Sequence, residues 1–423
     1  MSTHSAASQQ PVAPECPAHS LGYIFKPFDL ADPFPFYARA RAEESVFYSP
    51  EIGYWVVTRY DDIKAIFKDY ETFSAENAQA TYKPRPPEVQ QALDEGSFTA
   101  YSGLSARVPP DHTRLRAFVN KAFTPRRINS LEPHIRALID KMVGAFINEG
   151  QVDFVAQLAY DLPALVIFKL LGVPDQDVST VKQWAQSRVL LTWGDLPAEE
   201  QIQHARNLVQ YWSYCLKIVD ERFETPHDDL PGDLVRLYQE GDQSISKHEI
   251  ASICYSQLTA GHETTTNLLG NGLKALLTHR EQWEAICQNP ALIPNAIEEI
   301  LRHGSSVFAW RRRVKKPAIV GGVGLREGAN ILLLLGSANR DERNFVEADD
   351  LNVQRDNARD HLSFGHGIHY CLGAPLARLQ VRLVLEELTR RLPSLRLVEG
   401  QEIEYLPNTS FRGPRQLWVK WDT

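Results

Sequence analysis

Cysteine is scarce in this chain of 423 residues, and its five copies lie far apart. They are Cys16, Cys215, Cys254, Cys287 and Cys371, and no two of them form a C-x-x-C pair. The odd count and wide spacing argue against a disulfide framework, and the lack of paired cysteines argues against an iron–sulfur domain. The sequence therefore predicts a protein that works in the reducing interior of a cell.

Long apolar runs and excess positive charge are also missing. The longest wholly apolar run, Ile331–Leu335, is far shorter than the roughly 20 residues that cross a bilayer. Residues 1–20 lack the charged-then-apolar pattern of a secretory signal. A formal charge of -8 argues against general nucleic-acid binding, which needs a basic surface. We therefore expect a cytoplasmic protein with no membrane and no nucleic-acid partner.

Helical periodicity is what the sequence has in quantity. Apolar residues recur at spacings of three and four in the segments 128–148, 197–223, 246–279 and 371–391. Ser246 and Glu249 form a capping-box pair at the start of the third segment, which predicts a single helix roughly 50 Å long. Strand signals are confined to Val307–Val323 and Asn330–Leu335.

No linker, repeat or low-complexity stretch divides the chain after its polar N-terminus. Tyr82–Glu88 (YKPRPPE) predicts only a local loop, because its prolines remove backbone donors. We expect a flexible tail over residues 1–24, followed by one domain over residues 25–423. Its fold class is mainly α with a minor β-sheet.

The sequence around Cys371 predicts a loop that holds a ligand. Residues 364–373 read Phe-Gly-His-Gly-Ile-His-Tyr-Cys-Leu-Gly. The glycines before the cysteine permit a tight turn, Gly373 permits close approach by a flat cofactor, and Pro375 suits the first turn of a following helix. Amides and dipole at a helix N-terminus favour an anion by about 0.3–1 kcal/mol. This placement is expected to keep the sulfur deprotonated, as metal ligation requires.

The residues alone leave other assignments open. Cys371 could be a buried structural thiol, or a zinc ligand together with His366 and His369. Cys16, which precedes Pro17, could also present a thiolate, although it lies in the predicted tail.

The cysteine loop resembles the haem-binding signature of the cytochrome P450 family, F-x-x-G-x-[HR]-x-C-x-G. The residues in register are Phe364, Gly367, His369, Cys371 and Gly373. The resemblance implies a P450 fold, with haem b between the 246–279 helix and this loop. It also implies that Cys371 is the axial iron ligand, whose electron donation favours O–O cleavage. Phe364 and Gly365 would contact the cofactor.

A second motif lies in the middle of the 246–279 segment, where residues 260–265 read Ala-Gly-His-Glu-Thr-Thr. Gly261 costs about 1 kcal/mol in a helix interior. Thr264 can donate a hydrogen bond to the carbonyl of Ala260, so the two residues could open a notch for a diatomic ligand and water. A polar break without chemical role is the alternative.

The same segment resembles the family's A-G-x-[DE]-T-T motif. The resemblance implies that Thr264 hydrogen-bonds the oxygen ligand and that Glu263 helps to relay protons to it. Ala260 would lie against the haem pocket. Glu299 and Arg302 resemble the family's E-x-x-R pair, and Arg355 resembles the arginine that completes this structural network.

Haem carries two propionates, which need cationic or donor partners. His112 and Arg116 resemble the family's H-x-x-x-R and would share one helical face. Arg312 resembles the family's propionate arginine by its register, and a neighbouring arginine is the alternative. His369 is a further candidate, and His361 is a weaker one. The neighbouring Arg311, Arg313, Lys315 and Lys316 are expected at a solvated strand edge, where they could help to dock an acidic electron donor.

Within the family, the sequence most resembles haem domains of self-sufficient bacterial enzymes, which continue into an FMN and iron–sulfur reductase. This chain stops at Thr423. We expect electrons from NAD(P)H through a separate or fused reductase, or through a ferredoxin. The resemblance implies a monooxygenase that inserts one atom of molecular oxygen into a small aromatic or aliphatic substrate, by hydroxylation or O-dealkylation. Val307–Phe308 and the loop Tyr82–Tyr101 are further pocket candidates. A peroxide-driven peroxygenase and a non-catalytic haem protein that binds a ligand remain alternatives.

Overall fold

The computed structural model describes residues 20–101, 103–242 and 244–423. Helices dominate it, so the expected fold class, mainly α with a minor β-sheet in one domain, is confirmed. The predicted start of the domain at residue 25 is too late. Ser20 donates to Glu44 and the short 3-10 turn Leu21–Tyr23 packs with Leu21 buried. The remainder of the predicted tail, Cys16 included, lies outside the described residues.

The helices are numbered in the order in which they follow one another along the chain. They are α1 (Phe34–Glu43), α2 (Tyr60–Lys68), α3 (Pro87–Glu95), α4 (Asp111–Ala122), α5 (Pro125–Asn129), α6 (Glu132–Phe146), α7 (Leu162–Leu170), α8 (Val178–Trp193), α9 (Ala198–Glu224), α10 (Leu230–Gln239), α11 (Lys247–Ala260), α12 (Glu263–Thr278), α13 (Arg280–Gln288), α14 (Ile293–His303), α15 (Leu335–Ala338) and α16 (Ala374–Arg391). Helix α9 confirms the helix predicted over 197–223. The segment 128–148 divides instead between α5 and α6, and α16 begins after the cysteine rather than at it.

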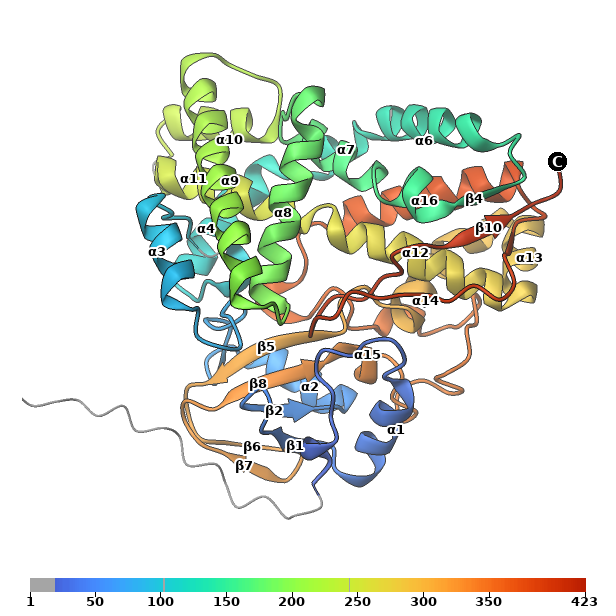
Figure 1. The fold of residues 1–423 in the computed structure, drawn as a ribbon, viewed down its shortest axis with the longest axis horizontal. Helices are drawn as coiled ribbons and strands as arrows, with labels where there is room; N and C mark the ends of the chain where they lie inside the picture. The colour runs from blue at the N-terminus through green and yellow to red at the C-terminus, as the bar shows by residue number, and fades with distance from the viewer. Residues whose placement is uncertain (1–19, 102, 243) are drawn as a thin grey trace, which may run out of the picture.

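The strands form three sheets, and the main one, of five strands, lies below most of the helices in Figure 1. They are β1 (Val46–Ser49), β2 (Tyr54–Val57), β3 (Phe73–Ser74), β4 (Gln151–Asp153), β5 (Ala309–Val314), β6 (Ala318–Val320), β7 (Val323–Leu325), β8 (Asn330–Leu334), β9 (Arg396–Leu397) and β10 (Trp418–Lys420). The main sheet has the order β1-β2-β8-β5-β3. Only β2 and β8 run parallel in it, and Arg312 of β5 pairs with Ile331 of β8. Strand β5 lies on the side of this sheet that is next to the helices (Figure 1).

The predicted single helix over 246–279 is wrong, because the structure breaks it at Gly261–His262 into α11 and α12. The capping box of Ser246 and Glu249 does begin α11 as expected. At the break, side chains replace the backbone donors: His262 Nδ1 lies 2.8 Å from the carbonyl of Leu258. Thr264 Oγ1 donates to the carbonyl of Ala260 at 3.1 Å. Local side-chain bonds of this kind compete with the helical ladder and open it.

Close approach of α7 explains why the break contains Gly261. A Cβ at this position would lie 2.3 Å from Cγ1 and 2.9 Å from Cβ of Ile167, closer than real side chains come. Only glycine lets the two helices meet at this distance. Tertiary packing therefore places the break.

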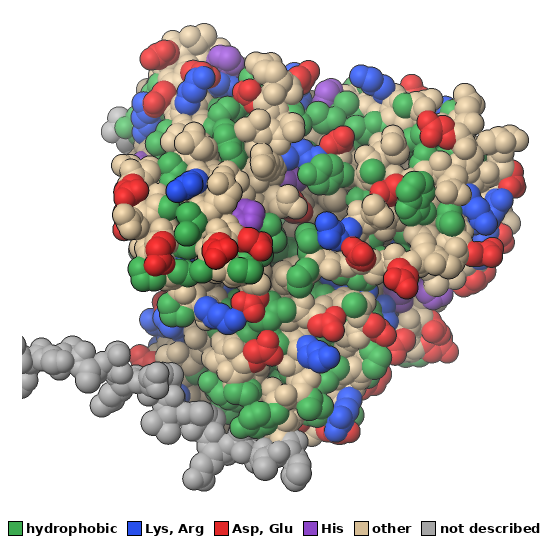
Figure 2. Space-filling view, in the orientation of Figure 1, with side chains coloured by type: hydrophobic (Ala, Val, Ile, Leu, Met, Phe, Trp, Pro, Cys, Tyr) green, Lys and Arg blue, Asp and Glu red, His purple; other side chains and the backbone are tan. Residues whose placement is uncertain are grey.

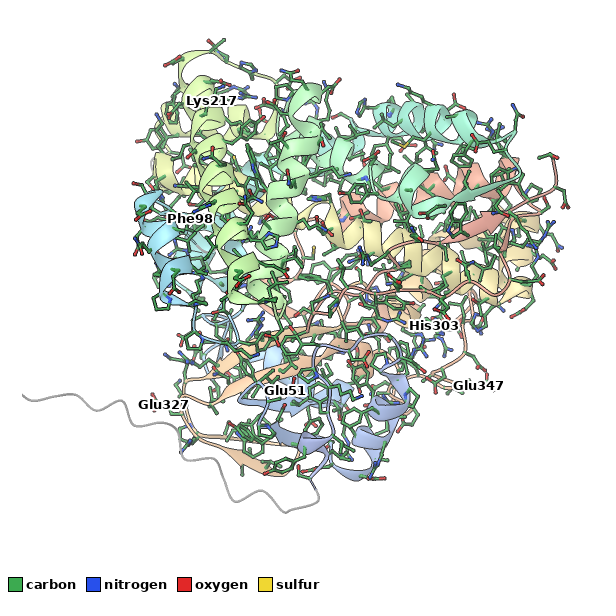
Figure 3. The ribbon with its side chains drawn as sticks, viewed as in Figure 1. Glu51, Phe98, Lys217, His303, Glu327 and Glu347 are labelled. Carbon is green, nitrogen blue, oxygen red and sulfur yellow. The ribbon has the colours of Figure 1, made fainter. Side chains whose placement is uncertain are left out.

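A buried charge network joins α14 to the loop that precedes the cysteine segment. Arg302 donates to both carboxylate oxygens of Glu299, at 2.7 and 2.8 Å, and Arg355 Nε donates to Glu299 at 3.1 Å. The guanidinium of Arg355 also donates to the carbonyl of Glu347. Figure 3 labels His303 at the end of α14 and Glu347 on this loop. The predicted structural role of the three charged residues agrees with these contacts.

Candidate active site

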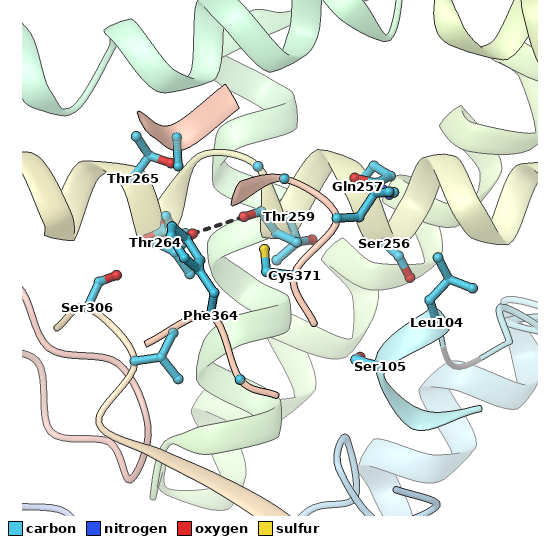
Figure 4. Close-up of a pocket in the computed structure, with 18 of the residues that line it drawn as sticks. Leu104, Ser105, Ser256, Gln257, Thr259, Thr264, Thr265, Ser306, Phe364 and Cys371 are labelled. Carbon is cyan, nitrogen blue, oxygen red and sulfur yellow. Dashed lines mark hydrogen bonds between the residues drawn. The ribbon is translucent and has the colours of Figure 1, made fainter. Parts of the chain in front are cut away.

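A cavity of about 280 Å³ separates the cysteine loop from the α11–α12 break. Figure 4 shows Cys371 between residues of these helices and the turn that carries Ser105. The predicted site residues that line the cavity are Arg116, Ala260, Glu263, Thr264, Arg312, Phe364, Gly365, His369 and Cys371. Segments separated by more than half of the chain therefore meet at one site.

The loop before α16 turns the sulfur of Cys371 into the cavity. Gly365 and Gly367 have φ values of 70° and 71°, the left-handed region that favours glycine. A Cβ on Gly367 would also lie 2.6 Å from the carbonyl oxygen of Phe67, so the loop could not pack on α2 with a larger residue. The backbone N–H of Cys371 then donates to the carbonyl of Phe364 at 2.9 Å.

The helix N-terminus alone does not keep this thiol deprotonated, contrary to the sequence-based expectation. The side chain of Cys371 is exposed to the cavity, yet the surrounding protein still desolvates it and raises its pKa above the usual value. The opposing hydrogen bonds from the amides of Gly373 and Ala374 and the charges of Arg116 and Arg378 do not overcome this effect. Desolvation disfavours the charged form more than these partners favour it. A bound metal cation is what would stabilise the thiolate here.

Across the cavity, Ala260, Gly261 and Thr264 come from the broken helix. The hydroxyl of Thr264 is satisfied by the carbonyl of Ala260, as Figure 4 shows with a dashed line. Thr264 still keeps an acceptor position toward the cavity, because a hydroxyl has two lone pairs beside its one proton. The predicted hydrogen bond and notch are confirmed as geometry.

Glu263 lies at the cavity wall, and its carboxylate interacts with His262 and Lys182. Burial alone would raise the pKa of its carboxyl group. The imidazole of His262, whose Nε2 lies 3.6 Å from Glu263 Oε1, and the charge of Lys182 outweigh burial and lower that pKa. Lys182 itself donates to Asp161 at 2.6 Å. Glu263 is therefore ionised at neutral pH and linked to polar groups that lead away from the cavity.

One flank of the cavity is rich in cations and unpaired donors. Arg312 is 2% exposed, and its Nη1 donates to the carbonyl of Arg311 at 2.7 Å. His369 lines the cavity beside it, with a buried Nδ1 that has no partner among the described residues. Arg116 completes the wall, and His112 lies behind it, with its ring 4.2 Å from that of His369. Buried groups of this type need an anionic or accepting ligand.

This donor set fits haem. A flat dianionic cofactor would compensate the charge of Arg312 and give partners to the orphaned nitrogens of His112 and His369. Cys371 lines the same cavity. Among the described residues, no cluster of three or more His, Cys, Asp or Glu side chains could hold a metal, which removes the zinc alternative with His366.

Three sequence-based assignments do not agree with the structure. His361 is not part of the described cavity wall; its Nε2 lies 3.3 Å from Glu298 instead. Phe308 is fully buried against Phe34, so only Val307 of that pair lines the cavity. Arg311 does not lie at a solvated edge: it is fully buried and donates to the carbonyls of Ala80 and Thr192. Alternation along β5 sends it away from Arg312.

Sequence reasoning missed a second wall of the cavity. Its residues come from the segment after β3, the 3-10 turn Leu104–Ala106, α8, α11, β5 and the C-terminal loops, and include Gln79, Ser105, Arg188, Trp193, Ser256, Trp310 and Phe411. Among the described residues of the predicted loop Tyr82–Tyr101, none lines the cavity. No local pattern marks these residues, because only the packing of α8 and α11 brings them together.

The surface and the helices limit other functions. Figure 2 shows acidic and basic side chains interspersed over the face in view, rather than one basic stripe of the kind that binds nucleic acid. In the described part of the chain, no helix is both long and apolar enough to cross a membrane.

Comparison with known proteins gives the family. The sequence model named cytochrome P450 matches residues 47–411. Cytochrome P450 monooxygenase PikC of Streptomyces venezuelae is 34% identical over 421 residues, which cover 98% of this chain and 97% of that protein. The solved structure of cytochrome P450 CREJ in complex with (4-ethylphenyl) dihydrogen phosphate is 51% identical, with a TM-score of 0.92, and the match covers 95% of this chain and 100% of that one.

A further solved structure bears on the expected resemblance to self-sufficient enzymes. An intact type IV self-sufficient cytochrome P450 monooxygenase is 40% identical with a TM-score of 0.90. The match covers 95% of this chain and 53% of that chain. With the cysteine loop, the broken helix and these relatives in agreement, the chain belongs to the cytochrome P450 family and is a cytochrome P450 monooxygenase.

Proposed function

We propose that the chain binds haem b with the thiolate of Cys371 as the axial iron ligand. In this proposal Arg312, Arg116 and His369 hold the propionates, and His112 supports His369 from behind. Phe364, Gly365 and Ala260 would contact the macrocycle. The single observation that carries the proposal is that the sulfur of Cys371 faces the break at Thr264 across one cavity.

When bound, haem supplies the iron at which molecular oxygen is reduced and one oxygen atom is passed to the substrate. The residues of this chain control water and protons there. Thr264 Oγ1 holds a proton at the cavity wall and can turn it from the carbonyl of Ala260 toward a ligand. Ionised Glu263 can accept a proton from the groups around Lys182 and pass it inward. Apolar neighbours such as Leu268 exclude bulk water.

We propose an alkyl-substituted phenol, esterified with phosphate, as the class of substrate. CREJ, which is similar over the whole length of its chain, was solved with (4-ethylphenyl) dihydrogen phosphate. The cavity of this chain has aromatic walls at Trp193, Trp310 and Phe411, with ring centroids of Trp193 and Phe411 4.9 Å apart. Such walls suit a small aromatic ring. Electrons would come from NAD(P)H through a ferredoxin or a flavin and iron–sulfur reductase.

Carbon monoxide difference spectroscopy tests the axial ligand. The reduced, haem-loaded chain should give the red-shifted Soret band of thiolate-ligated haem, and Cys371→His should abolish that band. A globin-like band in the unmodified chain would refute the assignment. Product formation with a surrogate reductase and oxygen, with hydrogen peroxide alone, and with neither then separates a monooxygenase from a peroxygenase and from a haem protein that only binds ligands.

A further inference from the structure

The wall of the cavity formed by α8 carries a buried cation without a carboxylate partner. Arg188 is 6% exposed and lines the cavity. Its Nη1 donates to the carbonyl of Tyr255 at 3.1 Å and its Nη2 to Oε1 of Gln79 at 2.7 Å. The guanidinium also stacks on the ring of Tyr255, with its carbon 4.5 Å from the centroid. No ion pair among the described residues includes Arg188, so only neutral groups face its charge.

Hydroxyl groups gather beside this guanidinium. Gln79 bridges Arg188 to Ser105, because its Nε2 donates to Ser105 Oγ at 2.5 Å. Ser256, the residue after Tyr255, lines the cavity with a buried Oγ that has no partner among the described residues. Figure 4 shows Ser105 and Ser256 on the side of the picture opposite Ser306. These groups come from three different elements and converge on one end of the cavity.

The other cavity cations are already engaged elsewhere. Arg116 and Arg312 lie on the flank of His369, which we assign to haem, and within the described residues Arg188 is the remaining arginine of the cavity wall. The carboxylate of Glu263 lies near His262 and Lys182 rather than near Arg188. A buried guanidinium among neutral partners is costly, and an anionic ligand removes that cost.

We propose that Arg188, Ser105, Ser256 and Gln79 form a subsite for the anionic group of the substrate, a phosphate monoester. This inference rests on the proposed function and adds the residues that recognise and orient its substrate. A guanidinium with adjacent hydroxyl donors matches the several oxygens of a phosphate dianion better than the two oxygens of a carboxylate. Anchoring the phosphate at this end leaves the rest of the molecule to extend along the aromatic walls toward Cys371.

The test measures binding to the haem-loaded full chain, by the haem spin-state shift and by calorimetry. Three probes are compared: 4-ethylphenyl phosphate, 4-ethylphenol and 4-ethylbenzoate. The phosphate ester should bind at least about tenfold more tightly than the phenol. Arg188→Gln should weaken phosphate-ester binding roughly 10- to 100-fold, the usual range for a lost hydrogen-bonded charge, and should leave 4-ethylphenol binding unchanged.

Control variants make the outcome decisive. Arg188→Lys should recover part of the affinity, Ser256→Ala should cost severalfold, and Arg206→Gln on the exposed side of α9 should change nothing. Unchanged ester binding in Arg188→Gln with a normal carbon monoxide band overturns the subsite alone, whereas a missing thiolate band in the unmodified chain overturns the proposed function. Tighter binding of the benzoate than of the phosphate ester overturns the phosphate class. If Arg188→Gln does not fold, Arg188→Lys and Ser256→Ala decide.

Discussion

Replacing Arg312 by methionine should have opposite effects on the haem-free and haem-loaded protein. Arg312 is buried, its guanidinium carbon lies 5.0 Å from the centroid of Phe67, and no carboxylate among the described residues pairs with it. Burial lowers the pKa of Arg312 from its usual value to about 10. The guanidinium is therefore still charged at neutral pH, but its charge costs free energy in the folded apoprotein, and a propionate is the partner that would offset this cost.

The magnitudes follow from the pKa and from hydrogen-bond energies. At about 1.4 kcal/mol per pKa unit, this lowering of the pKa sets an upper limit of roughly 3.5 kcal/mol for the cost of the charge in the apoprotein. Arg312→Met removes this cost and one hydrogen bond to a carbonyl, so the apoprotein should unfold at the same or a higher temperature. In the holoprotein, loss of a charge-assisted bond worth about 1.5–3 kcal/mol should weaken haem binding roughly 10- to 150-fold.

Haem transfer to excess apomyoglobin measures retention, and circular dichroism melting measures the apoprotein. The matched control is Arg313→Met, the next residue on β5, whose side chain is 42% exposed and pairs with Glu76 at 3.5 Å. A surface pair of this kind is worth about 0–1 kcal/mol, so the control should leave haem retention within about twofold. Equal haem loss from both variants, or a large drop in the apoprotein melting temperature of Arg312→Met alone, would refute the reasoning.

Three further predictions concern the oxygen side, the loop scaffold and the helix break. Thr264→Ala should cost less than about 1.5 kcal/mol of stability but should lower the amount of product per NAD(P)H consumed roughly tenfold or more. The remaining reducing equivalents should be released as hydrogen peroxide. Unchanged coupling would show that Thr264 takes no part in proton delivery. Burial alone would raise the pKa of Glu298, yet hydrogen bonds from Arg378 and His361 lower it to about 2. A carboxyl group whose pKa is lowered on folding stabilises the fold at pH values above its unfolded pKa of 4.5, and this stabilisation is lost as the pH falls toward 2. The difference in melting temperature between the unmodified protein and Glu298→Gln should therefore narrow from pH 5 to pH 3. A constant difference would contradict this linkage. Gly261→Ala should lower the free energy of unfolding by about 1–3 kcal/mol, because its methyl group overpacks on Ile167. Adding Ile167→Ala to the same chain should recover part of this loss, as measured by urea unfolding. Purely additive losses would show that the two side chains do not compete for space.

Local patterns were sufficient wherever neighbouring residues alone specify the geometry. The cysteine loop is such a case, because Gly365 and Gly367 occupy left-handed conformations that glycine favours, within a few residues of Cys371. The capping box at Ser246 satisfies the orphan amides of its own helix. The pair of Glu299 and Arg302 also lies on one helix, so its spacing was a valid guide to contact.

Patterns were insufficient wherever a distant segment decides the outcome. The helical spacing of apolar residues continues on both sides of Gly261 without interruption. Only the close approach of Ile167 on α7 shows why the helix breaks there. In the run of three arginines on β5, alternation separates Arg311 from Arg312 but cannot say which side faces the haem site. The pairing of β5 with β8 and the packing of the sheet below the helices decide it.

The sequence by itself determined the family chemistry of this protein: one cysteine in a glycine-rich turn before a helix, and an acid–alcohol pair in a helical segment. These are local features, and their physics is contained in a few consecutive residues. Tertiary structure alone decided which cations of the cavity wall are buried without a carboxylate partner and where the cavity ends. Arg188 carries no motif, and it becomes a candidate for substrate recognition only because α8 crosses α11 and places its charge among neutral groups of Gln79 and Tyr255.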